Sequence, residues 1–201
     1  MSDNFLIYKN ARESGKIIIG VDEVGRGAWA GPLVVAGVIL QVAIEGLRDS
    51  KKLNEARRID LTHKIKHISR FVILSFEPDE ISRFGLHQSN LELMRRVAQS
   101  LGNDDTFAFF DGYLPEQKPN YFAIKGGDDL IPEISAASII AKTYRDNLMR
   151  EYAIKYPQYD FDHNVGYGTP KHIDGLKNHG ICDIHRTSFA PIKSMIKRSL
   201  P

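Results

Sequence analysis

The chain has 201 residues, a length that suits one domain, and its 42% hydrophobic content excludes a disordered chain. The formal net charge of +2 excludes a polycation, and a single cysteine excludes an internal disulfide framework. The first ten residues lack a signal-peptide core, and the most apolar stretch, residues 27–40, is too short and too interrupted by glycine and proline to span a bilayer. We therefore expect a cytoplasmic protein with no membrane partner.

Strand and helix patterns run along the chain. Residues 16–21 form a β-branched run beside a glycine, which predicts a buried strand, and residues 33–40 form a second run after a Gly-Pro turn signal. Asn54 is suited to cap a helix over residues 55–68. The other predicted elements are strands at 71–76, 106–110 and 121–124 and helices at 90–101, 132–156, 169–178 and 191–198. This order predicts an α/β fold with helices packed on a mixed sheet.

Acidic residues follow two of the predicted buried strands. Asp22 and Glu23 come directly after the first strand, and Asp111 follows the strand at 106–110. Functional sites in open α/β sheets lie at strand ends. A lone aspartate there is more commonly a turn residue, so Asp111 stays open between the two interpretations, whereas the adjacent pair is harder to explain as a turn. If the strand continues, the pair points in opposite directions, and a turn at Gly25 would bring both towards one site.

The type of acid cluster indicates the type of cation. Mg²⁺ and Mn²⁺ bind carboxylate oxygens and keep several waters. Packing several acids together raises the cost of ionising them unless a cation neutralises the group. Because no cysteine or paired-histidine pattern accompanies the acids, the sequence favours Mg²⁺ or Mn²⁺ over Zn²⁺.

Gly25, Arg26 and Gly27, here called the Gly-Arg-Gly loop, follow the acids directly. Flanking glycines let backbone N–H groups approach a ligand closely, and the arginine can contact a phosphate or a sugar. Lysine and arginine are also concentrated over residues 48–70 and 186–201. Local basic patches of this kind can bind phosphates, but solvated helix faces give the same pattern, so charge alone does not separate the two.

These residues belong to a series of motifs that resembles bacterial ribonuclease HII, a type 2 ribonuclease H. Residues 20–27, Gly-Val-Asp-Glu-Val-Gly-Arg-Gly, followed by Ala-Gly-Pro at 30–32, look like the signature of that family. Further matching segments follow in the family's order: Asp-Ser-Lys-Lys-Leu at 49–53, Phe-Asp-Gly at 110–112, Gly-Asp at 127–128, the helical run 134–146, Gly-Tyr-Gly-Thr at 166–169 and His-Arg-Thr-Ser-Phe at 185–189. The resemblance extends from about Ile17 to Ile192, and several independent motifs in one order make chance agreement improbable.

The resemblance implies a set of metal ligands that spacing alone does not identify. The four are Asp22, Glu23, Asp111 and Asp128. Asp128 is preferred to the adjacent Asp129 because it follows a Gly-Gly pair as the family acid does. Together they would hold two divalent ions, Mn²⁺ or Mg²⁺, during catalysis.

The resemblance also implies a substrate-binding set. The Gly-Arg-Gly loop would bind the ribonucleotide through its 2′-hydroxyl, which distinguishes RNA from DNA. Tyr167 would stack against the sugar of the next deoxynucleotide and sense the RNA–DNA junction. Lys51, Lys142 and Arg145 are expected as phosphate contacts or supports, and the last two share a helix face because they are three residues apart.

For the whole chain, the resemblance implies a single ribonuclease H-like domain over residues 1–201, with a mixed central sheet flanked by helices. A small helical C-terminal extension from about residue 160 would pack on the core. The implied enzyme is an endonuclease that hydrolyses the RNA strand of RNA/DNA hybrids and the 5′ side of ribonucleotides embedded in duplex DNA. It would leave 5′-phosphate and 3′-hydroxyl ends and act in ribonucleotide removal from DNA and in RNA primer removal. Separately from the resemblance, nothing in the sequence requires more than a monomer.

Some positions depart from the family pattern or carry a second interpretation. Trp29 lies where the family often has leucine, and Val165 lies where many members have lysine, so one phosphate contact is expected to be missing. The C-terminal histidines do not have common zinc spacings. Of these, His172 and His179 are expected to share an exposed helix face, and His185 lies in a family motif that allows a supporting role. The single cysteine, Cys182, is expected to be a small packing residue.

Two other functional classes are compatible with this architecture. A small-molecule or ATP-handling protein usually carries two such domains and glycine-rich phosphate loops, and the chain is too short for two. A binding module without catalysis does not require four acids, which repel phosphate unless a metal intervenes. The related ribonuclease HIII has an added N-terminal domain, for which this chain has no room.

Overall fold

The computed structural model describes residues 3–47 and 53–198, and the chain divides into two compact units. Unit 1 comprises Met1–Val24, Val34–Leu74 and Asn90–Thr143, and unit 2 comprises Gly25–Leu33, Ser75–Ser89 and Tyr144–Pro201. Each unit is formed by segments that are distant in the sequence. The expectation of one domain with a C-terminal extension stays a prediction.

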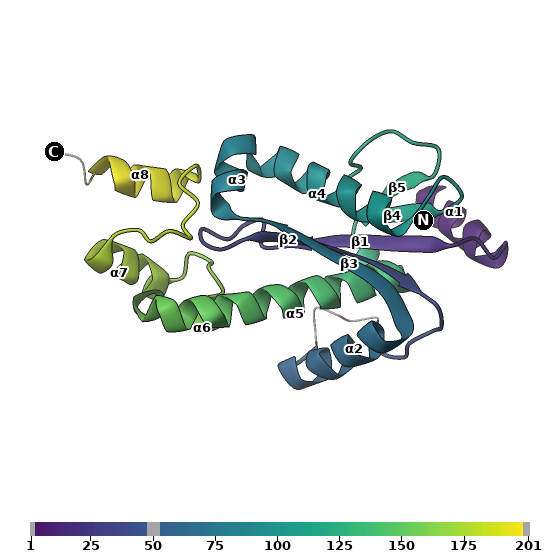
Figure 1. Cartoon of the computed structure of the whole chain (residues 1–201), viewed down its shortest axis with the longest axis horizontal. Helices are drawn as coiled ribbons and strands as arrows, with labels where there is room; N and C mark the ends of the chain where they lie inside the picture. The colour runs from purple at the N-terminus through teal and green to yellow at the C-terminus, as the bar shows by residue number, and fades with distance from the viewer. Residues whose placement is uncertain (1–2, 48–52, 199–201) are drawn as a thin grey trace. The chain divides into compact units, whose positions relative to one another are not determined.

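Five strands form one mixed sheet in the order β3-β2-β1-β4-β5 (Figure 1). They are β1 (Ile18–Val24), β2 (Leu33–Leu40), β3 (Ser69–Phe76), β4 (Phe107–Asp111) and β5 (Tyr121–Ile124). β1 pairs antiparallel with β2 and parallel with β4, and β4 pairs parallel with β5. The near-continuous burial of β1 and β2 is typical of strands covered on both faces. The predicted α/β class with a mixed central sheet is confirmed.

The helices account for most of the remaining described residues. They are α1 (Asp3–Glu13), α2 (Glu55–Ile68), α3 (Pro78–Phe84), α4 (Leu86–Leu101), α5 (Pro132–Lys155), α6 (Phe161–Asn164), α7 (Pro170–His179) and α8 (Ala190–Arg198), with short 3₁₀ helices η2 (Gly127–Asp129) and η3 (Pro157–Tyr159). In the part of the chain that the structure describes, no helix has both the length and the apolar character needed to cross a bilayer.

Two glycines determine which helix of unit 1 covers which face of the sheet. A Cβ at Gly20 would overlap the backbone of Glu133 in α5, whereas a Cβ at Gly37 would overlap the side chain of Val97 in α4. Gly20 is paired with Val38, the residue after Gly37, so the two glycines point to opposite faces. We call these the α5 face and the α4 face; Figure 1 shows α4 above the strands and α5 below them.

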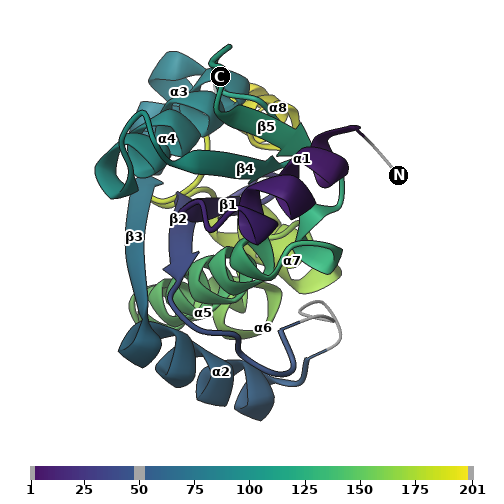
Figure 2. The ribbon, with the colours of Figure 1, turned by 90° about the vertical axis from the view of Figure 1, so that its right-hand side faces the viewer.

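Apolar clusters fill the α5 face of unit 1. One cluster joins Leu61 and Ile65 of α2 to Ala137 of α5 and to the inward side chains of β2. A second cluster joins Tyr8 of α1 to Phe109 and to neighbouring residues of β5, beside which α1 packs (Figure 2). Small residues at the start of α5, including Ala136 and Ala137, are fully buried and let this helix approach the sheet closely.

Unit 2 has an apolar core of its own. Its buried members are Ala30, Met149, Tyr159, Phe161, Leu176, Ile184 and Ile192. The segment after β1 is tied to the C-terminal region by backbone bonds, since Gly31 N–H donates to Ile184 O at 2.8 Å and Arg186 N–H donates to Trp29 O at 2.8 Å. The loop that follows the acids in sequence is therefore built together with residues about 150 positions away.

The structure differs from the predicted elements at several points, of which the short helix α6 and the 3₁₀ helices η2 and η3, none of them predicted, are the smallest. Helix α1 was not predicted, because only Tyr8 and Ala11 are buried in it and such a narrow apolar stripe gives little helical period. Helix α3 was not predicted either; its start is a capping box in which Glu77 and Glu80 satisfy each other's backbone N–H groups around a proline. Residues 22 and 23 lie inside β1 rather than after it, because pairing with β2 continues to Val24.

Gly20→Ala tests the close approach of α5 to the sheet. The new methyl group would overlap the main chain of Glu133, which cannot move without shifting the helix, so we expect the free energy of unfolding to fall by about 2–3 kcal/mol in urea. Gly27→Ala is the matched control, because a Cβ there meets only the Tyr167 ring at 3.5 Å. Equal stability of the two variants would contradict the assigned packing.

Candidate active site

Asp22 and Asp111 lie side by side on neighbouring strands. β1 and β4 pair in parallel with Gly20 opposite Phe109, and both of these residues point to the α5 face. Two residues further along each strand come the two aspartates, so alternation directs both to the same face. Asp22 is only 6% exposed, and its carboxylate accepts a hydrogen bond from the hydroxyl of Ser138 in α5.

A main-chain hydrogen bond joins Asp111 to the segment that carries Asp128. The N–H of Gly127, the first residue of η2, donates to Oδ1 of Asp111 at 2.7 Å. Gly126 has φ of 67°, a conformation that favours glycine and lets the chain turn into η2. Asp128 is 1% exposed, whereas Asp129 is exposed. The buried aspartate is thus the one that directly follows the residue bound to Asp111, which supports the choice of Asp128.

Glu23 occupies a different position from the other acids. It lies within β1 and pairs with Val35, so regular alternation directs its Cβ to the α4 face, opposite to Asp22. Its main-chain N–H donates to Oδ1 of Asp22 at 2.8 Å. The strand continues to Val24, so the backbone turns only after this pair, at Gly25, whose φ is 89°. Glu23 is still close enough to repel the carboxylate of Asp22.

The electrostatics of Asp22 show an unfavourable concentration of negative charge. Burial raises the pKa of Asp22 well above its ordinary value, and the charges of Asp111 and Glu23 raise it further. The hydrogen bonds from Ser138 and from the main chain of Glu23 act in the opposite direction but are the smaller effects. A divalent cation would offset this repulsion, and an all-carboxylate donor set suits a hard cation.

The acids are not packed as a tight single-ion cage. A single cation needs several ligand atoms close together. Among residues 3–47 and 53–198, ligand atoms of three residues lie within 4.8 Å of one another at Asp160, Asp162 and His163, which are half-buried to exposed and are not among the four acids. The four acids are spread more widely than that.

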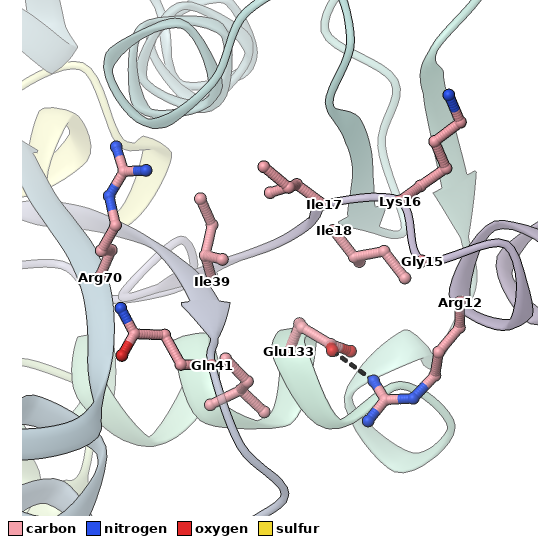
Figure 3. Close-up of a pocket in the computed structure, with 10 residues that line it drawn as sticks. Arg12, Gly15, Lys16, Ile17, Ile18, Ile39, Gln41, Arg70 and Glu133 are labelled. Atoms are coloured by element: carbon pink, nitrogen blue, oxygen red, sulfur yellow. Dashed lines mark hydrogen bonds and ion pairs between the residues drawn. The ribbon is translucent and has the colours of Figure 1, made fainter.

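A pocket of about 580 Å³ in unit 1 lies at the opposite end of β1 from the acids (Figure 3). Its lining includes Ile18, the first residue of β1, and Ile17 just before it. It also includes the ion pair between Arg12 and Glu133, whose Nη1 and Oε1 are 2.6 Å apart. None of the four acids lines this pocket. It is therefore separate from the candidate active site.

Arg145 is a buried support of the Gly-Arg-Gly loop and its continuation. It is 0% exposed, and its Nε, Nη2 and Nη1 donate to the carbonyl oxygens of Pro32, Ala30 and Val165 at 2.9, 3.0 and 2.8 Å. A Cβ at Gly25 would overlap this side chain. Burial lowers the pKa of Arg145 from its ordinary value. Of the two roles expected for Arg145, these three hydrogen bonds agree with the supporting one, and a phosphate contact stays a prediction.

Arg186 is a second buried arginine, which the sequence did not identify as a functional residue. It is 0% exposed, and it donates from Nε to Gly31 O at 3.0 Å and from Nη1 to Arg26 O at 3.1 Å. Burial and the nearby charge of Arg145 lower its pKa to about 9. Its place in the His-Arg-Thr-Ser-Phe motif was the available signal, but a motif position does not show that a cation is buried.

Tyr167 faces the Gly-Arg-Gly loop within unit 2. A Cβ at Gly27 would lie 3.5 Å from Cε1 of the Tyr167 ring, and the guanidinium of Arg145 lies 5.9 Å from the ring centroid. The carbonyl of Gly166, whose φ is 86°, accepts from the N–H groups of Trp29 and Ala30 at 2.8 and 3.2 Å. The structure therefore brings together the loop and the tyrosine that the family motifs predicted, and Tyr167 as a whole residue is 39% exposed.

Comparison with known proteins identifies one family. The sequence model described as Ribonuclease HII matches residues 19–192. The chain belongs to the ribonuclease HII family. A Ribonuclease HII from Francisella tularensis subsp. novicida is 43% identical over 184 residues, which cover 90% of this chain and 100% of that protein.

Solved structures of ribonuclease HII proteins have the same fold. The protein in the PCNA:RNase HII complex from Archaeoglobus fulgidus superposes with a TM-score of 0.74 at 26% identity, over 86% of this chain and 95% of that one. Ribonuclease H2 from Pyrococcus horikoshii OT3 gives a TM-score of 0.73 at 26% identity, over 90% and 97% of the two chains. The predicted ribonuclease H-like fold is thus confirmed, and as a ribonuclease HII family member the chain is an endoribonuclease, a hydrolase.

The remaining predicted site residues have different outcomes. Lys51 lies outside the described residues, as does most of the basic segment at 49–53. Lys142 is half-buried on α5. His172 is 0% exposed, so its expected place on an exposed face shared with His179 is wrong; its ring turns into the core of unit 2. Burial raises the pKa of Cys182 to about 11, which keeps it a thiol at neutral pH.

Arg145→Lys tests whether Arg145 of this ribonuclease HII family member stabilises the fold or binds a phosphate of the substrate. A lysine keeps the buried charge but cannot serve three carbonyls in a planar fork, so we expect the free energy of unfolding to fall by about 2–4 kcal/mol. Arg150→Lys on the same helix is the control and should change it by less than about 0.5 kcal/mol, because that arginine bonds to Asn147 in solvent. An unchanged stability with weaker, less salt-dependent substrate binding would instead indicate a phosphate contact.

Proposed function

We propose that the chain is an endonuclease that hydrolyses the RNA strand of RNA/DNA hybrids and cuts on the 5′ side of ribonucleotides embedded in duplex DNA. The products would carry 5′-phosphate and 3′-hydroxyl ends, and the cellular roles would be ribonucleotide removal from DNA and RNA primer removal. Membership of the ribonuclease HII family supports this substrate class. The observation that carries the proposal is the buried pair Asp22 and Asp111 on one face of the sheet, with Asp128 joined to it through Gly127.

The proposed metal ligands are Asp22, Glu23, Asp111 and Asp128, and the proposed ions are Mg²⁺ or Mn²⁺. When bound, two such ions would supply water activation, charge neutralisation at the phosphate and stabilisation of the leaving oxygen. The repulsion that raises the pKa of Asp22 supports this assignment, because buried acids without a cation are unfavourable. Ser138 would orient the carboxylate of Asp22 through its hydroxyl.

The proposed substrate-binding residues belong to unit 2. The Gly-Arg-Gly loop would bind the 2′-hydroxyl, and Tyr167 would stack against the sugar of the following deoxynucleotide. The support for this is the fixed conformation of the loop: Arg186 binds the carbonyl of Arg26, and Tyr167 faces Gly27. A loop that is held before substrate arrives needs little ordering on binding.

Four further assignments stay proposals. Lys51 and Lys142 would contact or support the phosphate backbone, for which positive side chains are the general means of affinity. The enzyme would act as a monomer and as a single domain. Its compartment would be the cytoplasm, which the single cysteine at position 182 supports because intracellular proteins rarely depend on disulfides.

Asp22→Asn tests the metal site together with the activity. Wild-type protein with Mg²⁺ or Mn²⁺ should cleave a duplex carrying one ribonucleotide, and the variant should lose at least about 100-fold in kcat while binding the duplex with similar affinity. In metal-free buffer the variant should be at least as stable as the wild type, because a buried repulsive charge is removed.

Asp129→Asn is the matched control, because Asp129 is exposed beside the buried Asp128. We expect this variant to keep its activity within about threefold of wild type. An intact duplex after incubation with wild-type protein and either metal would refute the nuclease assignment. Turnover retained by Asp22→Asn would place the metal site elsewhere.

Tyr167→Ala tests junction recognition. We expect it to lower kcat/KM on a single embedded ribonucleotide by about tenfold or more and to affect long RNA/DNA hybrids less, because only the former has a DNA sugar next to every cleavable position. Tyr167→Phe keeps the ring and should stay near wild type on both substrates. The same loss on both substrates would argue against stacking at the junction.

A further inference from the structure

Two histidines are buried against each other in unit 2. His172 of α7 is 0% exposed and His185, in the segment before α8, is 2% exposed. Their Nε2 atoms lie 3.0 Å apart, which is hydrogen-bond distance. Tyr159 packs edge-on against both rings, and Phe161 packs edge-on against His172. Polar rings enclosed in this way must satisfy their hydrogen bonds within the protein.

The position of the protons follows from the partner of His172. Its Nδ1 lies 2.9 Å from the main-chain carbonyl oxygen of Tyr167. A carbonyl oxygen only accepts, so this Nδ1 carries the proton and donates. In a neutral ring the other nitrogen, Nε2, is then an acceptor, and the Nε2 of His185 must donate to it.

The surroundings of His185 agree with this arrangement. With the proton on Nε2, its Nδ1 is an acceptor, and the main-chain N–H of Cys182 donates to it at 2.8 Å. The carbonyl of Cys182 lies 3.2 Å from the same Nδ1 and would favour the opposite tautomer. That tautomer would leave two lone pairs facing each other across 3.0 Å at the Nε2 atoms, so the N–H contact is the hydrogen bond. One directed series results, from Cys182 N–H through His185 and His172 to Tyr167 O.

The series requires both rings to be neutral. A second proton on His172 would place it on Nε2, directly against the Nε2–H of His185. Burial lowers the pKa of both histidines, that of His185 to about 4, so neutrality at physiological pH is consistent with their surroundings.

A metal ion between the two rings is the other chemistry that paired histidines offer. Structural zinc sites use four protein ligands. The thiol sulfur of Cys182 lies 3.2 Å from Nδ1 of His185. Within the described ranges, however, the two histidines and a third ligand form no group whose ligand atoms all lie within 4.8 Å of one another. The hydrogen-bonded series accounts for all four ring nitrogens, so it is the better explanation.

The series ends on the residue proposed to recognise the junction. The N–H of Tyr167 donates to Asn164 O at 2.9 Å, and its carbonyl accepts from Thr169 N–H at 2.8 Å as well as from His172. The main chain is thus fixed on both sides while the ring stays exposed next to Gly27. We propose that His172 and His185 are positioning residues that fix the main chain of Tyr167 and so determine the specificity for single ribonucleotides. This inference rests on the proposed function of Tyr167.

The tautomers can be measured without any activity. Long-range ¹H–¹⁵N spectra of the imidazoles at pH 7 should show His172 with its proton on Nδ1 and His185 with its proton on Nε2. The signals among the seven histidines are assigned from His172→Asn and His185→Gln. A protonated ring at either position, or the proton of His172 on Nε2, would overturn the proposal.

Two substitutions of His172 separate the hydrogen bond to Tyr167 from packing. Asparagine places its amide nitrogen near the position of Nδ1 and keeps the donor, whereas glutamine reaches towards the position of Nε2 and loses it. We expect His172→Gln to lower kcat/KM on a single-ribonucleotide duplex by about tenfold and His172→Asn to restore it to within about threefold of wild type. Equal losses in the two variants would overturn the proposal.

A double-mutant cycle shows whether the effect passes through Tyr167. Tyr167→Ala and Tyr167→Ala/His172→Gln should have the same kcat/KM within about twofold, whereas a general structural effect would be additive. His179→Gln, on the exposed part of the same helix, is the matched control and should leave activity and unfolding unchanged. Additive losses would refute the role inferred for His172 and would leave the proposed nuclease function standing. A wild-type protein that cleaves neither substrate would refute the proposed function and this inference with it.

Discussion

The parallel pairing of β1 with β4 is the constraint on which the proposed metal site depends. It aligns Gly20 with Phe109 and thereby sets Asp22 beside Asp111 on the α5 face. A shift of the register by one residue would move one of the aspartates to the other face, so the same contacts that align the strands also align the acids. Alignment has an energetic cost, since a buried carboxylate is held beside two others. Extensive apolar packing of α2 and α5 on this face offsets that cost.

In unit 2, the Gly-Arg-Gly loop and the residues after it are stabilised by two buried arginine side chains and not by apolar side chains. A segment rich in glycine has few side chains to pack, and its main-chain carbonyls still need partners when buried. Arg145 and Arg186 donate hydrogen bonds to five such carbonyls, those of residues 26, 30, 31, 32 and 165. A guanidinium suits this purpose because its donors lie in a rigid planar fork and its charge persists when it is buried.

The sequence alone predicted those features that depend on local pattern. The strand at 33–40, the helix at 55–68 and its cap Asn54 agree with the structure, because β-branched runs and caps act within a few residues. It could not separate Asp111 from a turn residue or Asp128 from Asp129, since the first depends on pairing with β1 and the second on burial beside Gly127. The family motifs supplied those choices. Burial also explains the interpretation that was wrong: a sequence shows that His172 is polar, but not that its ring is enclosed.

Three kinds of buried ionisable group in this chain respond differently to enclosure. Arginine cannot give up its charge, so Arg145 keeps it and satisfies carbonyls. Histidine can, and the His172–His185 pair has a complete set of hydrogen bonds only when both rings are neutral. A carboxylate can be neutralised by a proton or by a cation, so Asp22 is the group whose favourable state depends on what binds. Dependence on a metal ion should therefore be confined to the acids of unit 1, and the groups that support Tyr167 and the loop keep one protonation state whether or not an ion is present.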